Sequence, residues 1–458
     1  MLTSCGRSLW PGEIARRCIA VGMLERRFFS GTRVLNENGS GDGVRPGLHK
    51  SPITDKLWSL RNQVLAERNA KLKAGTELGQ SGDGLIPQIP LESKVAYEFS
   101  KDKELQSRYN NPWGTIRIGR VIEDLDALAG NIAFKHASAG SGGDDMMLVT
   151  ASIDRICLDH RANLKDDIVL SGKVTYVGSS SMEIHMEACS TWTSEPWLGA
   201  LFTFVARDRE TGRARRINPL TPQTPAEITA FQLGEQRANQ RKLSRKTTTD
   251  GIMLPKEYVS DSLVGFDQNI KKEQVSLQEM AEALFHKSSH RLLMPAIALK
   301  NAIQLSETEL SNTQVMQPQQ QNTAGRIFGG FLVRRAYELA FSTAYLFSGQ
   351  VPRFREIDQC TFRKPVDVGD LVHFRSSVLF CSDILHENPS VHVEVKAQVC
   401  NPQDSFAEDS NSFNFSFEVP KGTDLCTVVP ETLEDSLRIV QRYNDDLLQK
   451  HEDQEHKT

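Results

Sequence analysis

The sequence predicts an α+β protein built from two copies of one helix-and-strand unit. Two apolar helices are expected, one within "GTIRIGRVIEDLDALAGNIAF" (114–134) and one within "GGFLVRRAYELAFSTAYLF" (329–347). Each is followed by a strand in which apolar and polar side chains alternate, at 182–189 and at 390–399. Equivalent features lie about 205 to 210 residues apart, which indicates a tandem duplication.

The periodicity of the helices and strands supports each unit. In the first helix the apolar residues share one face, as a helix on a sheet requires; they are Ile118, Val121, Ile122, Leu125, Leu128, Ala129 and Ile132. The second helix is apolar around most of its circumference. Residues 168–177 are expected to form the strand before 182–189, with "GSSS" as the turn between them. Alternation favours antiparallel strands buried on one face only.

Composition excludes several classes of function. With 39% hydrophobic and 24% charged residues the chain is typical of a folded globular protein, and its net charge of −4 gives no reason to expect a nucleic-acid partner. No apolar run approaches the roughly 18 residues of a membrane span. The eight cysteines are scattered without a C-x-x-C pair, which favours reduced thiols over a disulfide framework or a zinc site.

The first 33 residues hold six arginines, no lysine and two glutamates. An Arg-rich, acid-poor segment with interleaved apolar residues is typical of a mitochondrial transit peptide, so we expect a mature protein in the mitochondrial matrix. The alternative is a disordered basic tail. The predicted organisation is a transit peptide, a partly helical N-terminal extension, domain 1, a linker region, domain 2, and a C-terminal helix with a polar tail, at 1–33, 34–90, 91–215, 216–299, 300–425 and 426–458.

The stretch "NTAGRIFGGFLVRRAYELA" resembles the acyl-coenzyme A thioesterases of the hotdog superfamily, whose pattern N-x-x-G-x-x-[FHY]-G-G leads into the central helix. The matching residues are Asn322, Gly325, Phe328, Gly329 and Gly330. "IGRVIEDLDALAG" resembles the same helix start in the first unit, and Asp126 falls where the family carries its acid. The resemblance implies tandem hotdog folds, each a long helix wrapped by an antiparallel sheet, and hydrolysis of acyl-CoA to a free acid and coenzyme A without a metal or redox cofactor.

The two units depart from the family pattern in complementary ways. Unit one has the acid Asp126 but lacks the aromatic-Gly-Gly entry, whereas unit two has the entry but carries Tyr337 at the position of the acid. The resemblance therefore implies one composite site, with Asp126 and Asn322 as catalytic residues. Backbone N–H groups near Gly329 and Gly330, at the positive end of the helix, are expected to receive an oxyanion, with Gly325 in the same loop.

A mirror-image site has a weaker basis. It would pair Asn110 or Asn111 with Tyr337 or Glu338, although Tyr337 fits a core position and Glu338 fits an ion pair with a neighbouring arginine. Weak candidates for binding coenzyme A are Arg363, Lys364, Ser179 and Ser180, because cations near strand edges can meet phosphates and the serine turn can lie near the coenzyme.

Several questions stay open at the level of sequence. A carboxylate can activate water as a general base or attack the thioester directly, and Asp126 is a candidate for either role. Asn322 can equally cap the turn that precedes the helix. Two alternative functions are a non-catalytic acyl-CoA binder and a hotdog hydratase or dehydratase. The resemblance further suggests a homo-oligomer, commonly of three double units.

Overall fold

The computed structural model describes most of the chain beyond the N-terminal region. The described residues are 51, 53–54, 56–59, 85–138, 146–158, 164–191, 196–244, 253–255, 274–294, 301–322, 325–358, 360–382 and 388–455. The predicted transit peptide and most of the N-terminal extension lie outside them. No helix in these ranges is long and apolar enough to cross a membrane.

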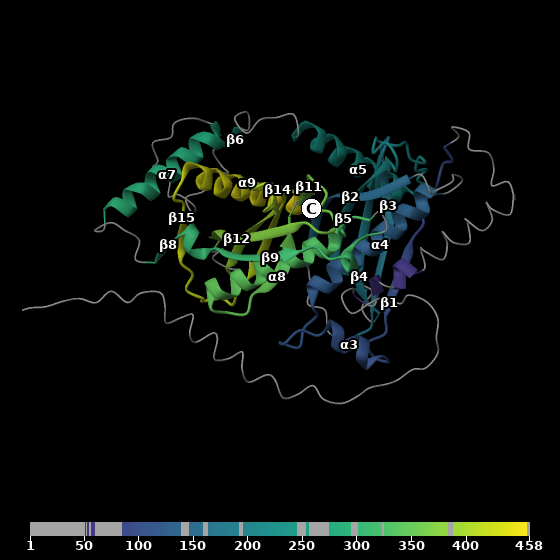
Figure 1. Cartoon of the computed structure of the whole chain (residues 1–458), viewed down its shortest axis with the longest axis horizontal. Coiled ribbons are helices and arrows are strands. Elements are labelled where there is room, and N and C mark those ends of the chain that lie inside the picture. Colours follow the sequence, from purple (N-terminus) through teal and green to yellow (C-terminus); the bar gives the residue numbers. More distant parts are fainter. Residues whose placement is uncertain are drawn as a thin grey trace, which may run out of the picture. The chain divides into compact units, whose positions relative to one another are not determined.

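The first repeat consists of a long helix and an antiparallel sheet, followed by a covering helix (Figure 1). Its elements are β1 (Ser93–Tyr97), α3 (Lys103–Tyr109), α4 (Ile118–Ser138), β2 (Met146–Leu158), β3 (Ile168–Val177), β4 (Ser181–Ser190), β5 (Pro196–Asp208) and α5 (Pro225–Ser244). The connector then contributes β6 (Met253–Pro255), β7 (Gln274–Ser276) and α7 (Leu277–Leu293).

The second repeat has the same plan. Its elements are β8 (Ala302–Gln304), β9 (Leu310–Val315), α8 (Gly329–Ser348), β10 (Arg353–Ile357), β11 (Cys360–Phe362), β12 (Leu371–Ser382), β13 (Ser390–Asn401), β14 (Phe406–Glu418), β15 (Thr427–Val429) and α9 (Leu433–Glu455), with 3-10 turns at Leu305–Thr308 and Pro318–Gln320. The helix α9 lies where the sequence predicts a C-terminal helix.

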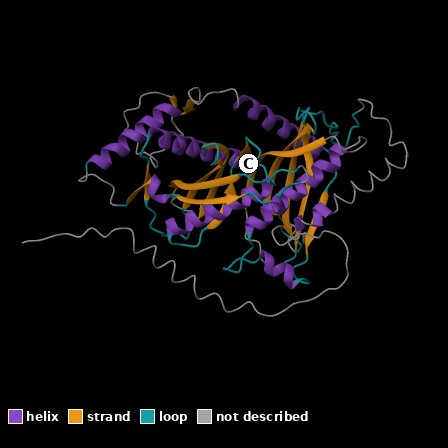
Figure 2. Ribbon diagram, in the orientation of Figure 1, coloured by secondary structure: helices purple, strands orange, loops and turns teal. Residues whose placement is uncertain are grey.

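The strand order proves the duplication. The first repeat runs β1-β3-β4-β5-β2, and the second runs β9-β12-β13-β14-β10, with β11 continuing the position of β10. The two sheets join edge to edge, because β2 pairs antiparallel with both β10 and β11, so that Ile357 lies opposite Ile156. Figure 2 shows the strands of both repeats with the helices against them. The predicted tandem hotdog fold of the α+β class is confirmed.

The outer faces of both sheets are partly covered by helices, which the sequence analysis did not anticipate. Alternation predicted that Glu183 in β4 and Glu394 in β13 face solvent, yet their exposed fractions are 1% and 9%. Each glutamate pairs with an arginine of the helix that follows its repeat: Arg237 of α5 donates to Glu183 at 2.6 Å, and Arg438 of α9 donates to Glu394 at 2.8 Å. An ion partner allows a carboxylate to be buried, so a period-two pattern alone misplaces these faces.

The two central helices pack against each other at glycines. A Cβ added to Gly330, in the first turn of α8, would lie 3.0 Å from the Cβ of Asp126 in α4. Gly119 stands in the same relation to α8, since its added Cβ would lie 3.1 Å from a ring carbon of Tyr337. Glycine permits this close backbone approach. Each of these two glycines therefore packs against the residue that lies seven positions after the equivalent glycine of the other helix.

Candidate active site

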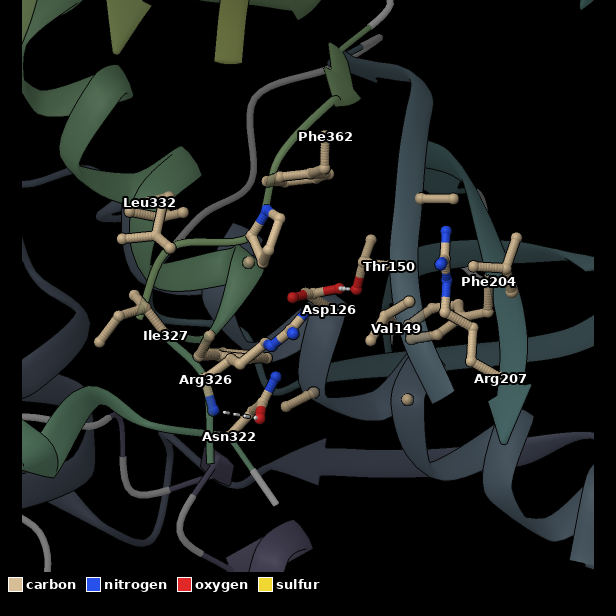
Figure 3. Close-up of a pocket in the computed structure, with 18 of the residues that line it drawn as sticks. Asp126, Val149, Thr150, Phe204, Arg207, Asn322, Arg326, Ile327, Leu332 and Phe362 are labelled. Carbon is tan, nitrogen blue, oxygen red and sulfur yellow. Dashed lines mark hydrogen bonds between the residues drawn. The ribbon is translucent and has the colours of Figure 1, made fainter. Parts of the chain in front are cut away.

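Asp126 lies in α4 at the crossing with α8. Its Oδ2 accepts a hydrogen bond from the backbone N–H of Gly330 at 2.6 Å, and its Oδ1 accepts one from the hydroxyl of Thr150 in β2 at 2.9 Å. Only 1% of the residue is exposed. Figure 3 shows the carboxylate directed toward Thr150, within the space that Asn322, Arg326 and Phe362 border from the second repeat. The carboxylate of one repeat is thus oriented by a helix start of the other.

The pKa of Asp126 is raised from 3.8 to about 6, chiefly by burial and to a smaller extent by the nearby Glu123 carboxylate. The hydrogen bonds from Thr150 and Gly330 act in the opposite direction, because they stabilise the charged form. A carboxyl group with a pKa near 6 is ionised at neutral pH and is a stronger proton acceptor than an exposed aspartate. Its environment therefore suits a general base.

Asn322 begins the loop that leads into α8. Its Oδ1 accepts from the N–H of Arg326 at 3.1 Å, and its own N–H donates to the carbonyl of Arg326 at 2.5 Å. Gly325 closes this turn with φ of +82°, a backbone conformation that glycine adopts without strain. The side chain of Asn322 both holds the turn and lines the same pocket as Asp126, so the two readings of this residue are compatible.

The structure changes the expectation for the oxyanion donors. The N–H of Gly330 is committed to Asp126, and the N–H of Gly325 donates to the carbonyl of Asn322 at 3.1 Å in an exposed turn. Neither group is therefore available for an oxyanion, and that expectation was wrong for both glycines. Gly329 also lines the pocket, and its N–H donates to no acceptor within the described part of the chain. It is the remaining backbone donor of the three.

The pocket has a volume of about 470 Å³ and takes its walls from both repeats. Four basic residues lie on its wall, one from the end of β5 and three from the loops of the second repeat: Arg207, Arg326, Arg363 and Lys364. Arg326 pairs with Asp367 at 3.5 Å, and Lys364 pairs with Glu408. Ser179 and Ser180 do not line this pocket; they form the turn between β3 and β4, where their carbonyls accept from Ile217 and Ala206. Their expected place near the coenzyme therefore gains no support from this pocket.

The mirror-image position holds a second cavity of about 340 Å³. Asn111 and Tyr337 line it, but none of its described lining residues is acidic. The Oδ1 of Asn111 accepts from the N–H groups of Trp113 and Thr115, whereas Asn110 is exposed and caps the C-terminal end of α3. Tyr337 is a core residue whose ring meets Phe354 at 5.4 Å, and burial raises its pKa well above the ordinary value. This cavity lacks the carboxylate that the first pocket has.

Glu338 belongs to an ion-pair network between the repeats. It accepts from Arg334 and Arg117 at 3.1 Å each and from Arg335 at 2.8 Å. Burial raises its pKa, but these three guanidinium groups outweigh burial and lower the pKa below the ordinary value. A carboxylate held in this way is a poor proton acceptor at neutral pH. The role of Glu338 as a secondary catalytic candidate is therefore not supported, and its role as an arginine partner is.

Thr150 and Trp58 are two of the pocket residues that the sequence analysis missed. Thr150 lies in β2, and its contact with Asp126 depends on how β2 is aligned with α4. A single sequence does not show this alignment, so no local sequence pattern identified Thr150. Trp58 lies in the N-terminal extension, a segment that carried little sign of chemistry, yet it lines the pocket. An isolated tryptophan in a helical pattern fits a core position equally well.

Two hotdog repeats that share one carboxylate-containing pocket define a double-hotdog protein. The chain is 38% identical over 411 residues to acyl-coenzyme A thioesterase 4, mitochondrial, of Humulus lupulus, covering 87% of this chain and 73% of that protein. It is 36% identical over 413 residues to acyl-coenzyme A thioesterase 2, chloroplastic, of the same species, with coverages of 87% and 89%.

A third relative is acyl-coenzyme A thioesterase 9, mitochondrial, of Homo sapiens, at 31% identity over 405 residues, 85% of this chain and 86% of that protein. No family profile matches the chain. This chain belongs to the acyl-coenzyme A thioesterase family. The resemblance drawn from the motifs is confirmed, and the thioesterase numbered nine, to which the motifs pointed most, is one of these relatives.

Proposed function

We propose that the protein hydrolyses acyl-CoA to a free carboxylic acid and coenzyme A in the pocket between its two repeats. The observation that carries this proposal is the position of Asp126: a buried carboxylate, with a raised pKa, held by Gly330 of the other repeat in a pocket of about 470 Å³. Membership of the thioesterase family supports the reaction class.

In the proposed reaction Asp126 acts as a general base. It takes a proton from a water molecule as the water oxygen attacks the thioester carbonyl carbon. The carbonyl becomes an oxyanion, and the collapse of this intermediate breaks the carbon–sulfur bond. The thiolate of coenzyme A leaves and receives the proton from the Asp126 carboxyl group, which restores the carboxylate. We propose the base role because the raised pKa of Asp126 suits proton transfer at neutral pH.

Two donors are proposed for the oxyanion. The Nδ2 of Asn322 carries two hydrogens, and its side-chain oxygen is fixed by Arg326, which orients the amide. The N–H of Gly329 lies in the first turn of α8, where the helix dipole favours negative charge. Of the three predicted backbone donors, this assignment keeps Gly329 and drops Gly330 and Gly325. None of these steps calls for a metal or a redox group.

Coenzyme A is proposed to lie along the basic wall. Arg363 and Lys364 are exposed and line the pocket beside Phe362, so their cationic groups can meet phosphate oxygens. The pairing of Lys364 with Glu408 reduces its availability, and Arg363 is the stronger candidate.

The hydratase and the non-catalytic binder are less well supported. Hydratase chemistry on this fold uses an acid–histidine pair, and no histidine is among the described residues that line the pocket. A passive binder has no need for a buried carboxylate at the centre of its pocket, because an unpaired buried charge lowers stability.

The deciding experiment is an assay of the purified protein against a panel of acyl-CoA substrates with a free-thiol reagent. Release of thiol by the wild type, with a loss of about 10²- to 10⁴-fold in kcat for Asp126→Asn, supports the proposal. Saturable binding without thiol release would favour the passive binder, and a change in enoyl absorbance without thiol release would favour the hydratase.

We also propose that the protein acts in the mitochondrial matrix as a homo-oligomer of three double-hotdog chains. The Arg-rich first 33 residues and the mitochondrial names of two relatives support the compartment. A fluorescent fusion of the first 33 residues should co-localise with a matrix marker, and a plastid signal would contradict this. Light scattering on the purified protein should give three times the mass of one chain.

A further inference from the structure

A segment outside both repeats contributes to the pocket wall. Trp58, within the helical residues 56–59, lines the cavity and packs edge to face on Phe328, with ring centroids 5.1 Å apart and an interplanar angle of 81°. Phe328 directly precedes α8 and therefore lies two positions from Gly330, the residue that holds Asp126. The N-terminal extension therefore contacts the residue that directly precedes α8, the helix whose first turn holds the Asp126 carboxylate.

A buried carboxylate anchors this segment. Asp124 has an exposed fraction of 0%, and its Oδ1 accepts from the hydroxyl of Ser51 and from the N–H and hydroxyl of Thr54, at 3.2 and 2.9 Å for Thr54. Its Oδ2 accepts from the hydroxyls of Tyr97, at 2.7 Å, and Tyr109. Five donors from three separate segments therefore converge on one carboxylate. Such a network fixes the extension on α4, because releasing any donor would leave the buried acceptor less satisfied.

Further contacts hold the segment close to Trp58 itself. The side-chain amide of Asn131 donates to the carbonyl of Leu57 at 3.2 Å, and Leu57 and Ile53 are each 5% exposed in the hydrophobic core. Asn131 also lines the pocket. The residue before Trp58 is consequently fixed by both a hydrogen bond and apolar burial, so the indole has a defined place in the wall.

Small residues of α4 lie between Asp126 and this wall. Asp126, Ala127, Gly130 and Asn131 all line the cavity, as residues i, i+1, i+4 and i+5 of one helix face. They span about 7.5 Å along the axis of α4. A chain that starts at a carbonyl beside Asp126 can pass Ala127, which has only a methyl side chain, and Gly130, which has none, before it meets Trp58.

We propose that Trp58 is the wall against which the acyl chain ends, and therefore a residue that determines acyl specificity, with Asp124 as the positioning residue that holds it there. This inference rests on the proposed thioesterase function. The acyl group fits this wall better than coenzyme A does, because Trp58 and its partner Phe328 are aromatic, whereas Arg207, Arg363 and Lys364 supply the charges that a nucleotide phosphate requires.

The test compares Trp58→Ala with Trp113→Ala in the full chain. Trp113 is the matched control, because it lines the second cavity and packs on Phe341 at 5.3 Å there. Values of kcat/KM are measured for acyl-CoA substrates from two to sixteen carbons, together with the melting temperature of each variant. Trp58→Ala should open the wall and raise the kcat/KM of longer chains relative to the wild-type optimum by about tenfold. Trp113→Ala should leave that ratio unchanged.

Two additional variants, Trp58→Leu and Thr54→Val, test the same proposal independently. If Trp58→Ala does not fold, Trp58→Leu retains apolar bulk and should give a smaller shift in the same direction. Thr54→Val removes one donor to Asp124 and should also shift the ratio toward longer chains, which a purely structural role would not do. A folded Trp58→Ala with a ratio within twofold of wild type, or with a change only in inhibition by free coenzyme A, would overturn the proposal. If the wild type itself releases no thiol, the proposed function fails instead.

Discussion

The backbone N–H of Gly330 donates to Oδ2 of Asp126 at 2.6 Å, across 204 positions of sequence. The donor belongs to the first turn of α8 and the acceptor to the middle of α4, so this bond joins the two repeats at the proposed reaction centre. A helix start is a favourable partner for a carboxylate, because its N–H groups lack acceptors within the helix and its dipole is positive there. Catalytic geometry and the packing of the repeats therefore depend on the same contact.

The pH dependence of the reaction should follow the ionisation of Asp126. Its pKa is about 6, so kcat/KM should rise with pH and level off above that value if the carboxylate is the base. Thr150→Val removes a hydrogen bond that lowers this pKa, and the midpoint should move upward by about one pH unit. The measurement is kcat/KM from pH 5 to 9 for both proteins. A midpoint that does not respond to Thr150→Val would remove Asp126 as the titrating group.

Asp126→Asn should remove activity and increase stability at high pH. The carboxyl group has a pKa of about 6 when folded and an ordinary value of 3.8, so the folded protein binds the proton more tightly. Burying the charge therefore costs stability above pH 6, by about 3 kcal/mol at most, and this cost disappears below pH 3.8. Urea unfolding should show a larger gain for the Asn variant at pH 8 than at pH 5. An equal effect at both pH values would show that the charge is not penalised.

Gly330→Ala and Gly119→Ala form a matched pair at the two helix crossings. Each added Cβ would be crowded, at 3.0 Å from Asp126 in one case and 3.1 Å from Tyr337 in the other. Both should lower stability by about 1–3 kcal/mol, because the helices must move apart. Only Gly330→Ala should reduce kcat strongly, since only that crossing holds the carboxylate. Equal losses of kcat in the two variants would indicate either that a shift at one helix crossing also displaces the other crossing, or that both cavities are catalytic.

More of the fold than of the active site could be predicted from the sequence. Periodicity located α4 and α8 and the strands β3, β4 and β13, because burial on one face leaves a regular pattern in sequence. Asp126 and Asn322 were found because motif spacing carries over from a family. Thr150 and Trp58 could not be found, since their positions depend on the register of β2 and on the docking of an extension. The direction of the Gly330 N–H was misjudged for the same reason: its acceptor is set by the packing of α4 on α8.

The contact between Arg334 and Glu123 should contribute strongly to the stability of the paired helices. These side chains meet at 2.9 Å across the repeat boundary, with exposed fractions of 8% and 1%. Arg334→Leu leaves Glu123 buried without its main counter-charge and should lower the free energy of unfolding by about 3–5 kcal/mol. The control is Arg108→Ala, whose partner Glu104 is exposed, and it should change stability by less than about 1 kcal/mol.

Adding Glu123→Gln to Arg334→Leu separates the ion pair from packing. The double variant should regain part of the lost stability, because it removes the uncompensated charge. Failure to regain any would assign the loss to the packing of the arginine stem.

Arg363 should contribute to binding of the nucleotide part of coenzyme A and not to binding of the acyl group. Arg363→Ala removes a cation from the pocket wall and should raise the KM for acyl-CoA about tenfold, since a hydrogen bond to a charged group contributes about 1.5–3 kcal/mol. The same variant should leave the KM for an acyl-pantetheine thioester unchanged, because that substrate lacks the nucleotide phosphates while it keeps the reacting bond. The increase for acyl-CoA should also shrink as salt is raised, since added ions screen an exposed charge. A parallel rise in KM for both substrates would place Arg363 at the thioester or in the fold of the loop, and the basic wall would then no longer be the binding site of the coenzyme.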